Sequence, residues 1–358
     1  MNPSHKPSHK KSESAKLKKR KCSFAIKLKR VAIIFIGIVL IFSFASIVKI
    51  FHTAYSIFSG RCIEIRDIQA GSINVHEHVQ NEESASKLLA VMDELNISAT
   101  LLLGSPEATL YLNRNGFTGY DENNKLAINL SKKYPGRFIP FCTIDVHNSD
   151  KFEEFKTYLN EGCIGLKLYS GHSMFYSLPL NDSSMDNIYE YCEKHRLPVV
   201  FHVNFYKFGA EFEDVLNKYP ELIVDCPHFC LISSNLSLLS ELMQKHPNLY
   251  TDISFGFYAQ DGFKRVSGNA KEFSKFLTEH QERVMFGTDM VITDNQRKSN
   301  SYISNLTHCY MGMLEEEQYG CFVADEIMGY FNGANLNRSV LDKIYSRNAE
   351  IFLGWIAR

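Results

Sequence analysis

From residue 72 onward, short apolar runs alternate with longer segments in which apolar residues recur every three to four positions. A nearly continuous apolar run is typical of a strand buried on both faces of a parallel sheet, and the longer spacing is typical of an amphipathic helix. The pattern predicts strands over residues 72–78, 100–104, 138–145, 164–169, 198–204, 222–228, 249–254 and 283–289. It predicts helices over residues 82–95, 122–134, 150–161, 182–196, 210–219, 235–246 and 270–280.

Eight strands with intervening helices predict an α/β protein whose catalytic part, residues 72–358, is one closed (β/α)₈ TIM barrel. A doubly wound open sheet is the alternative, and it usually carries a glycine-rich first turn. Residues 76–80, which form the first turn here, contain no glycine. The barrel is therefore favoured.

The segment before the barrel has a different composition. Residues 1–30 hold eleven Lys or Arg against one acidic residue, and residues 31–48 are apolar or small without any charge. Eighteen helical residues span about 27 Å, close to the thickness of a bilayer core. We therefore predict a basic cytoplasmic tail (1–30), a single transmembrane helix (31–51) and a linker (52–71), with the catalytic domain on the extracytoplasmic side. A cleaved signal peptide is the alternative. Membrane orientation accounts for the tail, so no nucleic-acid partner is expected.

The chain has nine cysteines, eight of them after the predicted anchor. An even number in an exported domain permits disulfides, but the sequence does not assign their pairing. Cys142, Cys163 and Cys226 lie in strand-like apolar runs, where a cysteine is usually a small buried hydrophobe.

Polar residues stand at the carboxyl ends of several predicted strands. The first strand ends with His76 and His78, the fifth with His202, the sixth with His228 and the eighth with Asp289. The carboxyl ends of all barrel strands meet at one mouth, so these side chains are expected to converge. A lone strand histidine is more often a packed side chain, but this joint pattern of imidazoles and one carboxylate predicts a site for Zn²⁺ or a similar divalent cation.

These residues resemble the amidohydrolase superfamily, in the branch of amidohydrolase-related hydrolases and decarboxylases. The resemblance covers residues 73–354 and includes the H-x-H pair, GLKLY around Lys167, the two later histidines, GTD ending in Asp289, and the closing LDKIYSRNAEIFLG. It implies that one metal is bound by His76, His78, His202 and Asp289. It also implies that His228 lies near the activated water or the substrate.

Three positions separate this chain from related patterns. Asn74 stands where the family commonly has aspartate, and Phe229-Cys230 replaces a common H-x-G ending. Lys167 replaces the glutamate of TatD-like nucleases, which makes that branch a poorer match. In some family members such a lysine is carboxylated and bridges two metals, and in others it lines the pocket. One ion is favoured, and a second ion with carboxylated Lys167 stays open.

The predicted activity is hydrolysis of a C–N or C–O bond in a small amide, lactam or lactone by a metal-activated water. Asp289 would accept a proton from the water and later deliver it to the leaving group, and His228 would stabilise the developing oxyanion. Lys167, Tyr169 and Asn204 are candidates for binding the substrate. A metal-dependent decarboxylase and a non-catalytic membrane-tethered barrel are the alternatives, and the sequence leaves homo-oligomerisation open. His172 is expected to be a surface or packing residue near the mouth.

Overall fold

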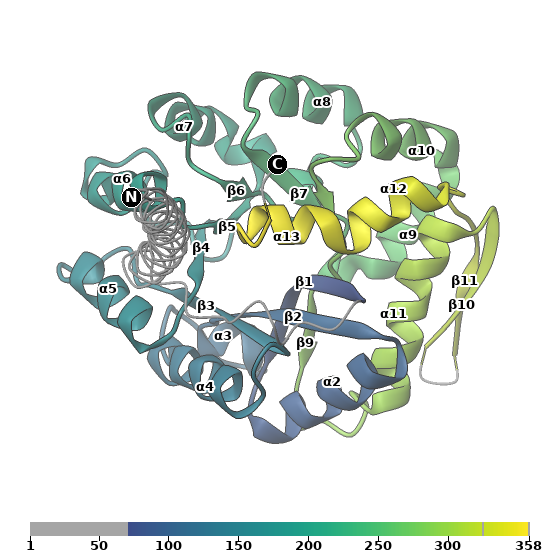
Figure 1. Ribbon diagram of the computed structural model, residues 1–358, viewed down its shortest axis with the longest axis horizontal. Coiled ribbons are helices and arrows are strands. Elements are labelled where there is room, and N and C mark those ends of the chain that lie inside the picture. Colours follow the sequence, from purple (N-terminus) through teal and green to yellow (C-terminus); the bar gives the residue numbers. More distant parts are fainter. Residues whose placement is uncertain (1–70, 324–325, 357–358) are drawn as a thin grey trace, which may run out of the picture. The chain divides into compact units, whose positions relative to one another are not determined.

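The computed structural model describes residues 71–323 and 326–356 (Figure 1). The parallel strands are β1 (Ser72–Val79), β2 (Ile97–Leu103), β3 (Phe138–Thr143), β4 (Gly165–Gly171), β5 (Val199–Val203), β6 (Val224–Asp225), β7 (Leu249–Asp252), β8 (Val284–Met285) and β9 (Met290–Ile292). The helices between and after them are α2 (Glu82–Glu94), α3 (Glu107–Leu110), α4 (Tyr120–Lys133), α5 (Lys151–Glu161), α6 (Asp186–His195), α7 (Phe205–Lys218), α8 (Leu236–Lys245), α9 (Ala259–Gly268), α10 (Ala270–Glu279) and α11 (Asn300–Glu315).

The strands form one parallel sheet in the order β8-β7-β6-β5-β4-β3-β2-β1-β9, consistent with the predicted (β/α)₈ barrel. Only β8 lies within the predicted eighth strand (283–289), because the strand is interrupted at residues 286–289 and continues as β9 from Met290. β9 pairs in parallel with β1, and the Val75 amide donates to the Phe286 carbonyl at 2.9 Å. The last strand therefore returns to the first, and in Figure 1 the helices surround the strands.

Every residue of β2 and β4 is buried, which explains their continuous apolar runs. Side chains alternate between the two faces of a strand. Along β2, Ala99, Leu101 and Leu103 join the apolar cluster inside the barrel, whereas Leu102 joins the larger cluster under the helices. The barrel thus has a packed interior and an outer helix–sheet layer.

The carboxyl-terminal helix α13 (Asn348–Phe352) packs against this interior cluster. The Phe352 ring lies 6.3 Å from that of Phe141 and 5.4 Å from that of Tyr250, and α13 crosses the centre of the barrel in Figure 1. Ile164 and Ile223, near the starts of their strands, belong to the same cluster. The amino-terminal end of the barrel is therefore closed by side chains, and the carboxyl-terminal end is left for a site.

Several elements were not predicted from the sequence. They are α3, α9, α11 and the antiparallel hairpin of β10 (Gln318–Val323) and β11 (Glu326–Asn332). Burial alternates along β10, as in a hairpin that packs one face on the core. The closing segment of the chain forms α12 (Arg338–Asp342), a π-helical turn (Lys343–Arg347) and α13.

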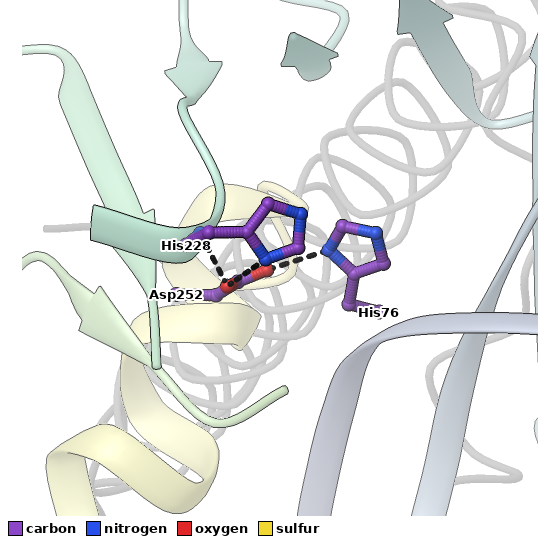
Figure 2. A group of neighbouring side chains, drawn as sticks. All are labelled: His76, His228 and Asp252. Atoms are coloured by element: carbon purple, nitrogen blue, oxygen red, sulfur yellow. Dashed lines mark hydrogen bonds and ion pairs between the residues drawn. The ribbon is translucent and has the colours of Figure 1, made fainter. Parts of the chain in front are cut away.

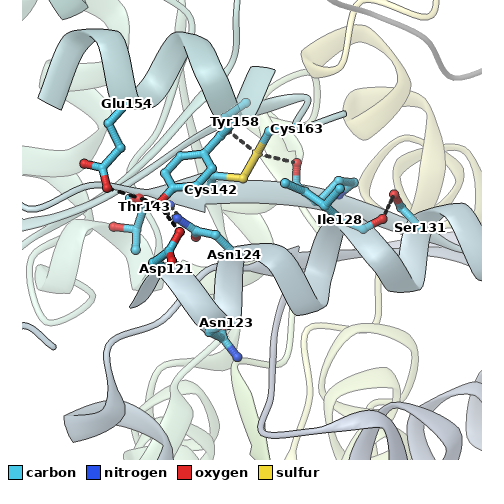
Figure 3. Close-up of a disulfide and its surroundings, with 12 residues drawn as sticks. Asp121, Asn123, Asn124, Ile128, Ser131, Cys142, Thr143, Glu154, Tyr158 and Cys163 are labelled. Atoms are coloured by element: carbon cyan, nitrogen blue, oxygen red, sulfur yellow. Dashed lines mark hydrogen bonds between the residues drawn. A yellow bond between two sulfur atoms is a disulfide. The ribbon is translucent and has the colours of Figure 1, made fainter. Parts of the chain in front are cut away.

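The described residues contain three disulfides, Cys142–Cys163, Cys226–Cys230 and Cys309–Cys321. The expectation that Cys142, Cys163 and Cys226 are simple buried hydrophobes is therefore corrected. They are buried, as expected, but each has a partner thiol within bonding distance. The neighbouring strands β3 and β4 bring Cys142 to Cys163, and the turn after β6 brings Cys230 back to Cys226. Figure 3 shows the bond from Cys142 in β3 to Cys163, which stands just before β4. Only the folded sheet could reveal this pairing.

Replacing both Cys142 and Cys163 with alanine is expected to lower the free energy of unfolding by about 3 kcal/mol, because the bond closes a segment with a sequence separation of 21 residues. Urea unfolding of the full chain measures the change. Cys192→Ala is the matched control, since Cys192 is a buried free thiol. Equal destabilisation by the control would assign the effect to the lost buried sulfur rather than to the cross-link.

The predicted tail, the predicted transmembrane helix and all but the last residue of the predicted linker lie outside the described residues. Within residues 71–323 and 326–356, no helix has the length and apolarity needed to cross a bilayer.

Candidate metal centre

The H-x-H pair of β1 places two imidazoles at the carboxyl end of the barrel. His76 and His78 are both buried, and residues two apart in a strand point to the same face. Nε2 of His76 lies 3.2 Å from Oδ1 of Asp289, and Nε2 of His78 lies 3.1 Å from the same oxygen. Three predicted ligands therefore meet at one point, with ligand atoms within 4.8 Å of one another.

Asp289 reaches this point because the eighth strand is interrupted before it. Its backbone is left-handed (φ 52°), a conformation that aspartate tolerates better than most residues, and its amide donates to the His76 carbonyl at 2.8 Å. The carboxylate packs against Gly256, where a Cβ would lie 2.2 Å from Oδ2. A glycine at 256 therefore leaves room for the carboxylate.

The second ring nitrogen of each β1 histidine faces an acceptor. Nδ1 of His76 lies 2.7 Å from the Asp252 carboxylate, and Nδ1 of His78 lies 2.7 Å from the Ser105 hydroxyl and 3.2 Å from the Leu103 carbonyl. The carboxylate and the carbonyl lack a hydrogen, and the Ser105 hydroxyl donates its own hydrogen to the Leu103 carbonyl at 2.8 Å. Each Nδ1 therefore carries the proton of the neutral ring, and each Nε2 keeps its lone pair. Two imidazole lone pairs and a carboxylate oxygen then face one another, an arrangement that needs a cation between them. The donor set fits a divalent metal ion.

Asp252, at the end of β7, has no predicted role, yet it joins two of the site histidines (Figure 2). One oxygen accepts from His76, while the other accepts from the His228 amide at 2.9 Å and from the Ser254 amide at 3.0 Å. The Ser254 hydroxyl donates to the same oxygen at 2.5 Å and lies 2.7 Å from Nδ1 of His228. A polar residue at the end of an apolar strand is the signal that could have identified it.

Two further histidines, His202 of β5 and His228 in the turn after β6, lie beside this point. The His228 ring is 4.9 Å from the His76 ring and 4.9 Å from the His202 ring, and its Nε2 lies 3.5 Å from Oδ2 of Asp289. Nε2 of His202 is buried without a hydrogen-bond partner among the described residues. His202 is absent from the two ligand groups that the described side chains form, which are His76–His78–Asp289 and His76–His228–Asp252.

The loop that carries His228 is strained. His228, Phe229, Cys230 and Leu231 all have φ between 53° and 60°, a left-handed conformation that costs such residues roughly 1–2 kcal/mol each. The Cys226–Cys230 disulfide closes a short loop around His228. Because backbone strain of this kind concentrates at functional sites, it marks His228 as a residue whose position is constrained.

Lys167 and Tyr169 of β4 line a cavity at the carboxyl end of the barrel, the end at which the sequence predicted them. Nζ of Lys167 lies 3.4 Å from Nε2 of His76, and the Tyr169 hydroxyl lies 3.2 Å from the hydroxyl of Ser105. Asn204 differs from its predicted place, because its amide donates to Ser173 at 3.3 Å and it is not among the residues that line this cavity.

His172, predicted to be a surface or packing residue, lies in the cavity wall with its ring 4.5 Å from that of His202.

Asn74 replaces an aspartate common in the family, and its contacts explain how it fits. Its side-chain amide donates to Glu77 at 2.7 Å and to Thr288 at 3.2 Å, and its oxygen accepts from the His76 amide at 3.1 Å. Glu77 also accepts from the Met290 amide at 2.9 Å, and burial raises the pKa of Glu77 to about 8. This buried network ties β1 to the interrupted eighth strand.

Burial sets the charge of the central groups. It lowers the pKa of His76 to about 4, with a further contribution from the charge of Lys167, and it lowers the pKa of Lys167 to about 8. Burial alone would raise the pKa of Asp289, but the neighbouring histidines outweigh it and hold that pKa well below its usual range. At neutral pH, His76 is therefore a neutral imidazole and Asp289 a carboxylate, the forms that bind metals.

A cavity of about 590 Å³ opens at this end of the barrel and contains these groups. Its inner part is formed by His76, His78, His202, Lys167 and Asp289. The volume lies within the range of about 300–1,000 Å³ found for small-molecule sites. The candidate centre is therefore placed where a small ligand can reach it.

Comparison with known proteins identifies the class first by fold. An uncharacterized TIM-barrel protein from Bordetella bronchiseptica matches with a TM-score of 0.54 and 16% identity, over 80% of this chain and 100% of its own. A putative 2-pyrone-4,6-dicarboxylic acid hydrolase from Pseudomonas putida matches with a TM-score of 0.55 and 13% identity, over 81% and 100%. An amidohydrolase from Burkholderia multivorans with bound zinc matches with a TM-score of 0.51 and 9% identity, over 79% and 99%.

At these identities the solved structures show the fold alone, and no curated protein matches the chain significantly. The family is shown by sequence, because the amidohydrolase family model matches residues 73–355. The chain belongs to the amidohydrolase family.

Proposed function

We propose that this protein is a metal-dependent hydrolase that cleaves a C–N or C–O bond, as in an amide, lactam or lactone, of a small molecule. His76, His78 and Asp289 would hold the cation, with His202 as a further ligand and zinc as the first candidate. The observation that carries the proposal is that Nε2 of His76 and Nε2 of His78 each lie within 3.2 Å of the same Asp289 carboxylate oxygen inside the cavity. Zinc bound to the Burkholderia multivorans amidohydrolase supports the choice of metal.

A divalent cation in this place supplies water activation and polarisation of a substrate carbonyl. The protein's own groups account for the remaining chemistry. Asp289, deprotonated at neutral pH and 18% exposed, would accept a proton from the attacking water and return it to the leaving group. His228 lies on the other side of this carboxylate and would stabilise negative charge that develops on the substrate oxygen. Lys167 adds a cationic side chain at the inner wall.

Metal removal tests this proposal directly. The full chain purified without chelator is expected to contain about one divalent ion per chain, and dialysis against a chelator should abolish turnover of a panel of amides, lactams and lactones. Adding Zn²⁺ back should restore it. Elemental analysis measures the ion, and release of amine or alcohol measures the reaction.

The same assay separates the alternatives. Release of CO₂ from carboxylic acid substrates, with no amine or alcohol from the panel, would identify a decarboxylase instead. A protein that carries no metal and ignores the chelator would point to the non-catalytic barrel. Two ions per chain would favour the second site at carboxylated Lys167.

We further propose that residues 31–51 tether the enzyme to a membrane with the barrel on the extracytoplasmic side. The uncharged apolar run and the basic residues before it support this topology. The three disulfides of the described residues agree with an oxidising compartment.

A further inference from the structure

The mouth of the cavity carries an unusual share of exposed apolar surface. Nine large apolar side chains are exposed in the described part of the chain, and five of them line this cavity. These five, which we call the apolar rim, are Tyr111, Leu112, Met174, Phe257 and Tyr258. Exposed apolar residues are normal when scattered singly, whereas a group beside a binding cavity indicates a contact surface.

The apolar rim is built from three separate loops on the carboxyl side of the barrel. Tyr111 and Leu112 follow α3, Met174 follows β4, and Phe257 and Tyr258 follow β7. Leu112 is 89% exposed and Phe257 is 82% exposed, so neither side chain contributes much to the core. Water contact with these side chains is unfavourable, and a ligand that covers them recovers this free energy.

Other residues that line the cavity are polar. They include Gln80 after β1 and Thr293, Asp294, Asn295 and Lys298 after β9. The inner end carries the histidines, Lys167 and Asp289. The cavity therefore has cationic and metal-binding groups at its inner end and exposed apolar groups at its mouth.

From this arrangement we propose that the substrate is amphipathic. Its reactive carbonyl or carboxyl group enters the inner end, and an apolar alkyl or aryl group lies against the apolar rim. The inference rests on the proposed metal site for the polar end of the ligand. It adds the substrate class, which the ligand residues alone do not specify.

Binding of linear carboxylates tests the apolar rim without requiring turnover. The probes are butanoate, hexanoate and octanoate, titrated by calorimetry into the full chain in lipid nanodiscs, with empty nanodiscs subtracted for lipid partitioning. For the wild type we expect affinity to rise about threefold with each added carbon, since each buried methylene adds favourable transfer. The double variant Leu112→Ser/Phe257→Ser should lose most of this dependence and bind butanoate as the wild type does.

Tyr330→Ser is the matched control, because Tyr330 is 75% exposed but lies outside the residues that line the cavity. It should keep the full dependence on chain length. A flat series in the wild type, or an equal dependence in the double variant, would overturn the proposal. Protection of a Leu112→Cys thiol by lipid and not by octanoate would also overturn it and assign the apolar rim to the bilayer surface.

The experiment also separates this inference from the proposed function. Each titration is repeated on metal-stripped protein. A dependence on chain length that persists while metal has no effect on affinity would uphold the apolar rim and count against the metal site. Tighter binding with Zn²⁺ but no dependence on chain length would uphold the metal site and refute the apolar rim.

Discussion

Asp289→Asn is expected to lower turnover by about 10²–10⁴-fold, the range typical of a lost general acid–base group, while the protein still binds a divalent ion at saturating concentration. Asparagine has nearly the same shape and accepts the left-handed backbone at this position (φ 52°). The hydrogen bond from the residue 289 amide to the His76 carbonyl is unaffected. What is lost is the carboxylate charge and its capacity to take a proton. Steady-state kinetics with metal analysis of the same samples measures both quantities.

Asp294→Asn provides the matched control for this variant. Asp294 lines the same cavity, but it lies on the exposed polar side of the mouth. Its substitution removes an equal charge without touching the ligand group, so turnover should change by less than about threefold, as for a surface charge. Activity of Asp289→Asn within tenfold of the wild type would remove Asp289 from the proposed acid–base role.

Asp252→Asn is expected to weaken metal binding by about 10–100-fold, the effect typical of losing an outer partner of a metal-binding histidine. We regard Asp252 as a positioning residue, since its carboxylate contacts His76 and the His228 amide but lies behind the ligand point. Raising the Zn²⁺ concentration should restore turnover in this variant, which a general loss of structure would not allow. Competition with a chromophoric chelator measures the affinity.

Asp252→Asn should weaken metal binding because a side-chain amide cannot replace both carboxylate oxygens of Asp252. If the asparagine oxygen faces Nδ1 of His76, its NH₂ group faces the donor amides of His228 and Ser254. If the NH₂ group faces His76 instead, Nδ1 must accept, the ring proton moves to Nε2, and the lone pair that faces Asp289 is lost. The first orientation leaves buried donors unpaired, which costs about 1–3 kcal/mol of folding free energy. The second removes a nitrogen lone pair that the metal needs.

Asp225→Asn is the control for replacing a buried aspartate near the site without removing a contact to His76. Asp225 is fully buried on the adjacent strand β6, and its carboxylate has no hydrogen-bond partner among the described residues. Burial and the nearby Asp252 raise its pKa well above the usual range. Its substitution should therefore leave metal affinity within a few-fold. An equal loss of affinity in both variants would show that a general disturbance of the buried strand ends, rather than the orientation of His76, is responsible.

Most of the sheet could be predicted from the sequence, because strands that are buried on both faces consist of nearly continuous apolar residues. The predicted strands at 138–145 and 249–254 begin where β3 and β7 begin, and the β1 prediction differs by one residue. Elements that pack outside the repeated strand–helix pattern, such as α11 and the β10–β11 hairpin, were missed. Which of their residues are buried depends on the surface against which they pack, and that surface exists only in the folded chain.

For the candidate centre, the sequence by itself determined the chemistry available at the strand ends. The spacing of His76 and His78 fixes them on one face of β1, and the strand ends place His228 and Asp289 at the same mouth. Only the tertiary structure decided which atoms meet. The interruption of the eighth strand aims Asp289, the carboxylate of Asp252 sets the His76 tautomer, and three loops form the apolar rim. These contacts join residues far apart in the chain, so no local sequence pattern predicts them.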